Sequence, residues 1–145
     1  MRVCIDASFC GALVFPEPFT QAANRLVTQW MAAGASLIAP DLWVYEVTAI
    51  VRKRVRSGLV SVANSPATLD TFLSLPILLM RPPNLHRDAL ALANRHGLPA
   101  TYDAHYLALA ETERVPLWTA DERLYRAVGR VLPWVRWVGE AGAGS

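Results

Sequence analysis

Cysteine and long apolar runs are scarce in this sequence, and each shortage excludes a class of protein. Only Cys4 and Cys10 could form a disulfide among 145 residues, so we expect a reduced, cytoplasmic protein rather than a disulfide scaffold. Even the apolar run at 73–80 is short and interrupted by Pro76, so no segment is expected to span a bilayer. The N-terminus leads directly into a strand pattern, and we expect no cleavable signal peptide.

Several ligand-binding signatures are also missing. The three histidines are dispersed, and two cysteines do not complete a zinc set. No Gly-x-x-x-x-Gly-Lys run and no Gly-x-Gly-x-x-Gly after a strand is present, which removes the usual nucleotide-binding interpretations. Lys53 is the only lysine, and Asp6-Ala7-Ser8 lacks a second aspartate two residues on. A phosphatase with an aspartate nucleophile therefore ranks last among the enzyme classes considered.

Apolar residues are abundant, at 53% of the chain. This composition and length fit one well-packed α/β domain with its own core. The net charge of +2 does not by itself indicate a nucleic-acid-binding protein. Thirteen of the fourteen basic residues are arginine, which suits bidentate phosphate contacts, but a coding bias toward arginine explains this equally well.

Short β-rich runs alternate with amphipathic segments along the chain. This order predicts an α/β fold with a mainly parallel sheet covered on both faces. We expect one domain over residues 1–138 and a flexible Gly/Ala-rich tail at 139–145. The predicted strands are 3–6, 36–39, 77–80, 116–119 and 135–138, and the predicted helices are 18–33, 41–56, 64–74, 84–96, 102–113 and 121–130.

Four acidic residues lie in otherwise apolar segments, near the start or end of a predicted element: Asp6, Glu46, Asp103 and Asp121. Carboxylates beside a core are costly unless a cation meets them. Mg²⁺ and Mn²⁺ prefer oxygen ligands and could unite all four. Asp6 ends the first strand and Asp121 follows the fourth, so both would project from one edge of the sheet, where ligands collect. A metal-dependent nuclease is the leading interpretation.

Each of the first two acids also has an ordinary structural explanation. Asp6 could cap the segment that follows it, although Ser8 could fill that role instead. Ser8 itself could either cap or help to position metal-bound water. Glu46 taken alone reads as an exposed glutamate at the edge of a buried helical stripe, and it gains weight only from the other acids.

The other two acids stand at predicted helix starts. Asp103 could interact with the helix dipole, with Thr101 as N-cap. Thr119 and Glu122 have the spacing of a capping box, and Asp121 between them could add dipole stabilisation. A cap and a metal site can coexist, because the box needs only Thr119 and Glu122.

One basic cluster, Arg52, Lys53, Arg54 and Arg56, closes the helix that carries Glu46. It could simply complement the helix dipole, or it could contact RNA. Among the tryptophans, which are expected mainly in the core, Trp43 could line a cleft near Glu46.

Taken together, the motifs resemble a PIN-domain ribonuclease, specifically a VapC-like toxin of a bacterial toxin–antitoxin pair. The resemblance extends to about Val138. Its carriers are Ile5-Asp6-Ala7-Ser8, Pro40-Asp41-Leu42 before Glu46, Tyr102-Asp103-Ala104 with Tyr106-Leu107-Ala108-Leu109-Ala110, and Thr119-Ala120-Asp121 with Leu124.

The resemblance implies a three-layer α/β/α sandwich whose four acids share one pocket and hold one or two Mg²⁺ or Mn²⁺ ions. Ser8 and Thr119 match positions that support the carboxylates. It further implies hydrolysis of RNA to a 3′-hydroxyl and a 5′-phosphate, a homodimer, and a small antitoxin that blocks the pocket and relieves growth inhibition. The competing interpretation is a non-catalytic interaction module in which the acids are caps and surface charge.

Overall fold

Five parallel strands form the central sheet of the structure, a computed structural model in which residues 1–143 are described. The strand order is β3-β2-β1-β4-β5, and every neighbouring pair is parallel. The predicted α/β class and parallel sheet are therefore confirmed. The strands are β1 (Arg2–Ile5), β2 (Ser36–Pro40), β3 (Ile77–Met80), β4 (Leu117–Thr119) and β5 (Val135–Trp137).

The central strand β1 lies between β2 and β4 and is apolar over its last three residues. Cys4 is opposite Ile38 on one side and Leu117 on the other, and all three are fully buried. Beyond the strand, the Asp6 N–H still donates to the carbonyl of Trp118 at 3.3 Å. Strand order reverses between β1 and β4, so this sheet edge is the place where α/β folds bind ligands.

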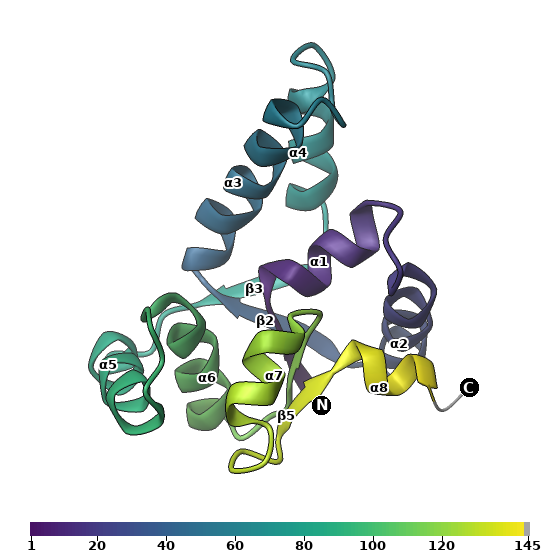
Figure 1. The fold of residues 1–145 in the computed structure, drawn as a ribbon. Helices are drawn as coiled ribbons and strands as arrows, with labels where there is room; N and C mark the ends of the chain where they lie inside the picture. Colours follow the sequence, from purple (N-terminus) through teal and green to yellow (C-terminus); the bar gives the residue numbers. More distant parts are fainter. Residues whose placement is uncertain (144–145) are drawn as a thin grey trace.

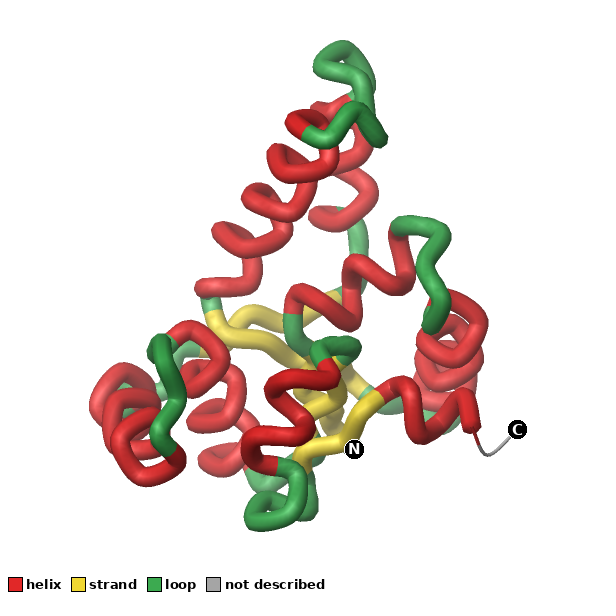
Figure 2. The backbone as a smooth tube through the Cα atoms, viewed as in Figure 1, coloured by secondary structure: helices red, strands yellow, loops and turns green. Residues whose placement is uncertain are grey.

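Helices cover the sheet on both faces, which confirms the predicted three-layer arrangement (Figures 1 and 2). In one layer α1 contacts α2, α3 and α4, and α2 contacts α8. On the opposite face α6 packs against β1, β2 and β4, with α5 alongside it. The helices are α1 (Ala7–Val14), α2 (Thr20–Ala32), α3 (Leu42–Arg56), α4 (Ser65–Leu73), α5 (Leu85–His96), α6 (Tyr102–Glu113), α7 (Glu122–Val128) and α8 (Val138–Ala143).

Two short helices were not expected from the sequence. Helix α1 is apolar almost throughout and buries Phe9, Cys10 and Ala12, so it has no polar face to produce a helical period. Helix α8 occupies residues 138–143, where a flexible tail was expected from residue 139 on. The structure thus differs from that expectation over 139–143, and residues 144–145 of the expected tail lie outside the described residues.

The α3–α4 hairpin projects from the body of the molecule (Figure 1). Helix α3 leaves the sheet at the end of β2, and the basic cluster lies in its outer half. Strand β3 forms the outer edge of the sheet and exposes Leu78 and Leu79. Both cysteines are free and buried. No helix within residues 1–143 is long and apolar enough to cross a membrane.

Candidate active site

All four predicted acids line one cavity of about 450 Å³. They arrive from four places in the fold: the ends of β1 and β4, helix α3, and the first turn of α6. Because β1 and β4 are parallel neighbours, Asp6 and Asp121 lie at the same edge of the sheet, as the sequence predicted. The cavity is also lined by Ser8, Lys53, Tyr106 and Arg123.

Asp6 is buried, with 4% of its surface exposed. Its Oδ1 accepts hydrogen bonds from the Phe9 N–H at 2.9 Å and the Ser8 hydroxyl at 2.7 Å. Asp6 is therefore the N-cap of α1, and this role coexists with its place in the cavity. Burial raises the pKa of Asp6 from 3.8 to about 6, and the nearby Asp103 carboxylate adds to the rise, although hydrogen bonds oppose it.

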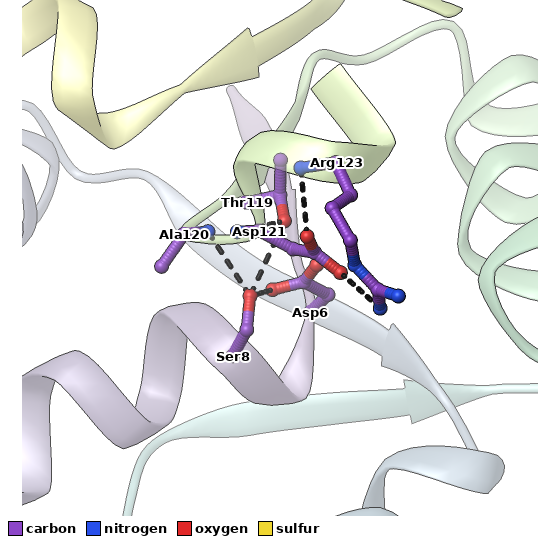
Figure 3. A network of polar contacts seen from close by, with 6 residues as sticks. All are labelled: Asp6, Ser8, Thr119, Ala120, Asp121 and Arg123. Carbon is purple, nitrogen blue, oxygen red and sulfur yellow. Dashed lines mark hydrogen bonds and ion pairs between the residues drawn. The ribbon is translucent and has the colours of Figure 1, made fainter. Parts of the chain in front are cut away.

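The two hydroxyls predicted to support the acids join the two strand ends (Figure 3). Ser8 Oγ accepts from the Ala120 N–H at 3.0 Å and lies 3.2 Å from Thr119 Oγ1. Thr119, which is fully buried, accepts from the Asp121 N–H at 2.9 Å. The first turn of α1 is thereby bonded to the segment after β4, which fixes the spacing of Asp6 and Asp121.

Asp121 itself caps α7. Its Oδ1 accepts from the Arg123 N–H at 2.9 Å, and its Oδ2 lies 3.5 Å from the Arg123 guanidinium. The capping box that the spacing of Thr119 and Glu122 offered as a structural alternative is not formed. Thr119 instead bonds within the strand-end network, and Glu122 pairs with Arg126 at 2.6 Å on the surface. The cap begins two residues later than the spacing suggested, because β4 continues through Thr119.

The sequence around Glu46, taken alone, suggested an ordinary exposed glutamate, but the structure shows otherwise. It is half-buried, and its Oε1 accepts a hydrogen bond of 2.5 Å from the hydroxyl of Tyr106. Burial raises the pKa of Glu46, and the charge of Asp103 raises it further, while the Tyr106 hydrogen bond opposes both. This carboxylate is held on the cavity wall by a buried partner.

Asp103 interacts electrostatically with each of the other three acids. Burial raises the pKa of Asp103, Asp121 raises it further, and Arg123 opposes the rise. Asp103 in turn raises the pKa of both Asp6 and Glu46. The predicted cap before this helix is not formed, since Thr101 makes no side-chain capping bond to α6. Asp103 therefore lies at the centre of the mutual repulsion.

The donor set suits a hard divalent cation, because carboxylate oxygens are the ligands that Mg²⁺ and Mn²⁺ prefer. A cation would also relieve the repulsion that raises these pKa values. Within residues 1–143, however, no three acidic, histidine or cysteine side chains are grouped closely enough to hold one ion as they stand. Asp6, Glu46 and Asp121 each have at least one carboxylate oxygen engaged by protein groups. The ion pair between Asp121 and Arg123 spans 3.5 Å and its arginine is largely exposed, so it is a weak competitor for an ion.

The basic cluster divides into two parts. Lys53 lines the acidic cavity and, together with Arg52 and Arg56, an adjoining cavity of about 440 Å³. Arg54 belongs elsewhere: it pairs with Glu17 at 2.6 Å, and its guanidinium lies 4.1 Å from the centre of the Phe15 ring. Its predicted RNA contact is therefore not supported by its position.

Trp43 does not line the cavity. It is buried, and its indole N–H donates to the Cys10 sulfur at 3.2 Å. Two cavity residues, Tyr106 and Arg123, were not singled out as site residues in the sequence. Tyr106 lies three positions after Asp103 on one helix, so their shared face was the available signal.

Comparison with known proteins identifies the family of this chain. A model of the PIN domain matches residues 3–130. Ribonuclease VapC3 of Pyrobaculum aerophilum is 34% identical over 128 residues, covering 86% of this chain and 92% of that protein. Ribonuclease VapC12 of Mycobacterium tuberculosis is 30% identical over 127 residues, covering 88% of this chain and 92% of that protein.

Solved structures share the fold. PAE2754 of Pyrobaculum aerophilum superimposes with a TM-score of 0.68 at 22% identity, covering 99% of this chain and 96% of that chain. VapBC2 of Rickettsia felis, solved bound to a DNA fragment from its promoter, superimposes with a TM-score of 0.65 at 15% identity, covering 94% of this chain and 97% of that chain. These identities bear on the fold alone, whereas the family follows from the domain match and the curated relatives. The chain therefore belongs to the PIN-domain family, within its VapC-like group.

Proposed function

We propose that this protein is a metal-dependent endoribonuclease that acts as the toxin of a toxin–antitoxin pair. The observation that carries the proposal is the meeting of four carboxylates from separate elements in one cavity at the switch point of the sheet. The two ribonuclease relatives support RNA as the substrate. RNA hydrolysis at this site would leave a 3′-hydroxyl and a 5′-phosphate.

Asp6, Glu46, Asp103 and Asp121 are the residues that would hold Mg²⁺ or Mn²⁺. Such an ion, when bound, lowers the pKa of a coordinated water molecule and neutralises the negative charge that develops on the phosphate. The protein's own part is to hold the carboxylates in place. Ser8 and Phe9 fix the oxygen of Asp6, and Thr119 fixes the backbone at Asp121.

The basic row on α3 offers a path for the RNA backbone. Lys53 stands at the boundary between the acidic cavity and the one lined by Arg52 and Arg56. A phosphate chain that crosses the acidic cavity would meet these three cations next. Because α3 projects from the body of the molecule, the row can reach single-stranded loops of a folded RNA (Figure 1).

Two partners complete the proposal. The VapBC2 complex of Rickettsia felis supports an antitoxin as a partner of this chain. A homodimer is supported by exposed apolar groups, including Leu78 and Leu79 of the edge strand β3 and the exposed rings of Tyr45 and Tyr102. The two tyrosines border an apolar-walled cavity of about 250 Å³. An enzyme that acts on cellular RNA would work in the cytoplasm.

The test is cleavage of total cellular RNA by the purified protein with Mn²⁺ or Mg²⁺, with EDTA as the metal-free arm. Asp6→Asn should abolish discrete cleavage and leave the fold intact, because asparagine keeps an oxygen for the Phe9 and Ser8 bonds. Asp70→Asn, on the exposed face of α4, is the matched control and should cleave normally.

Thermal unfolding with added Mn²⁺ separates the alternatives. A ligand that binds the folded state raises the melting temperature. Cleavage that is undiminished in Asp6→Asn would contradict the proposal. Absence of both cleavage and Mn²⁺ stabilisation in the unmodified protein would favour the non-catalytic interaction module, in which the acids serve as helix caps and surface charge.

A further inference from the structure

A buried tyrosine and a glutamate from different helices are joined at the wall of the acidic cavity. Tyr106 on α6 is 1% exposed, and its hydroxyl donates to Oε1 of Glu46 on α3 at 2.5 Å. No other group within residues 1–143 forms a hydrogen bond with this hydroxyl. A buried hydroxyl with one partner is costly to leave unpaired, so the bond is strongly favoured.

The bond constrains Glu46 more than Tyr106. The tyrosine ring is packed in the core, whereas a half-buried glutamate has three rotatable side-chain bonds and many accessible rotamers. A tyrosine hydroxyl has one proton to donate, and here it is donated to Glu46. Tyr106 therefore fixes the direction of the Glu46 carboxylate.

Helix α6 carries both this donor and another carboxylate of the site. Asp103 and Tyr106 are three positions apart, which places them on one face of the helix, and both line the cavity. A single rigid helix thus sets the position of Asp103 directly and that of Glu46 through a hydrogen bond. Within the described residues, no hydrogen bond engages Oε2 of Glu46.

We propose that Tyr106 is a positioning residue for Glu46: it holds Oε1 and leaves Oε2 as the single oxygen that the glutamate offers to a bound cation. The inference rests on the proposed metal-dependent function. Without the hydroxyl, the Glu46 carboxylate would rotate among several orientations, and ordering it would reduce the affinity for the ion.

The first test compares Tyr106→Phe with Tyr125→Phe, measuring the Mn²⁺ concentration that gives half of the maximal rise in melting temperature. Tyr125 also donates to a glutamate, Glu140, but does so at the surface, so it is a matched control. Tyr106→Phe should raise the half-maximal Mn²⁺ concentration about tenfold, the size expected for one hydrogen bond to a charged group. Tyr125→Phe should leave it unchanged.

A double-mutant cycle separates positioning from packing. In a Glu46→Gln background, Tyr106→Phe should change the half-maximal Mn²⁺ concentration by less than about twofold, because the carboxylate it orients is already gone. The same tenfold loss in both backgrounds would show that the tyrosine acts through packing, and would overturn the inference. Glu46→Asp, whose shorter side chain withdraws from Tyr106, gives a second approach should Tyr106→Phe fail to fold, and should show the same loss.

The outcomes for the two proposals are distinct. An unmodified protein that neither gains stability with Mn²⁺ nor cleaves RNA would contradict the proposed function itself. An unmodified protein that does both, together with a Tyr106→Phe variant of equal Mn²⁺ response, would overturn only the role of Tyr106. RNA cleavage by Tyr106→Phe at saturating Mn²⁺ should recover most of its rate, as expected if the hydroxyl serves ion binding.

Discussion

The hydroxyl of Ser8 accepts a hydrogen bond of 3.0 Å from the backbone N–H of Ala120, a residue 112 positions away in the chain. The same hydroxyl donates to Asp6 at 2.7 Å. One small side chain therefore connects the first turn of α1 to the segment after β4 and holds a carboxylate of the site (Figure 3). The spacing of the acids depends on this connection as much as on the strands themselves.

Replacement of Ser8 by alanine should lower the free energy of unfolding by about 1–3 kcal/mol, since the Ala120 N–H loses its acceptor and Asp6 loses a donor. Urea denaturation measures this directly. Ser74→Ala is the control, because the Ser74 hydroxyl bonds only to the exposed carbonyl of Thr71, and should cost less than about 0.5 kcal/mol. Equal losses in the two variants would show that the strand-end network adds no stability.

Stability in the absence of metal should fall as the pH rises from about 4 to about 6. The pKa of Asp6 is 3.8 in its ordinary state and about 6 in the fold. Between these values the folded state binds more protons than the unfolded state, so its free energy of unfolding decreases with pH. The fall from Asp6 is on the order of 3 kcal/mol at most. Burial also raises the pKa of Glu46 and Asp103, so both act in the same direction.

Urea denaturation at pH 4, 5, 6 and 7 checks this prediction, with Asp6→Asn as the comparison. The variant should lose part of the pH dependence in that window, because its amide does not titrate. Saturating Mn²⁺ should reverse the slope, because the ion binds ionised carboxylates and competes with protons. A metal-free protein that gains stability from pH 4 to 6, with the same slope in Asp6→Asn, would contradict the account of Asp6.

The sheet could be predicted from sequence because its strands are short apolar runs bounded by helical segments. The run at 77–80 and the helix at 102–113 match the structure at both ends. Helix α1 could not be found in this way, because its burial on nearly all sides leaves no polar residues at a helical spacing. Only packing against several elements at once explains why that segment is helical.

The four acids could be chosen from sequence, since each interrupts an apolar segment near an expected element end. Their partners could not. The bond between Tyr106 and Glu46 joins residues 60 positions apart, and no local pattern encodes such a contact. The capping box at Thr119 failed for a related reason, because the Thr119 hydroxyl bonds to the Asp121 N–H and lies 3.2 Å from the hydroxyl of Ser8, 111 positions away.

Asp121 has two roles that substitution can separate. Asparagine is as good an N-cap as aspartate, so Asp121→Asn should keep the bond from the Arg123 N–H and leave stability within about 0.5 kcal/mol. It should nevertheless reduce both the Mn²⁺-induced rise in melting temperature and RNA cleavage. Asp121→Ala should show the same losses and a further cost of about 1 kcal/mol from the missing cap. Full Mn²⁺ response in Asp121→Asn would remove this residue from the proposed site.

The basic row on α3 should contribute to RNA affinity through charge alone. Replacing Arg52, Lys53 and Arg56 together by glutamine should weaken binding to single-stranded RNA and reduce the slope of log affinity against log salt by about 0.7 per lost phosphate contact. Arg54→Gln is the control within the same helix, because that side chain is occupied with Glu17 and Phe15. It should lower stability by about 1 kcal/mol and leave the salt slope unchanged.

Filter binding with the Asp6→Asn protein, which does not cut the probe, gives the affinities at each salt concentration. The control would contradict this account if Arg54→Gln lowered the salt slope by as much as each substitution in the triple variant does on average. In that case all four basic residues would contact the RNA, and not only the three that line the cavities.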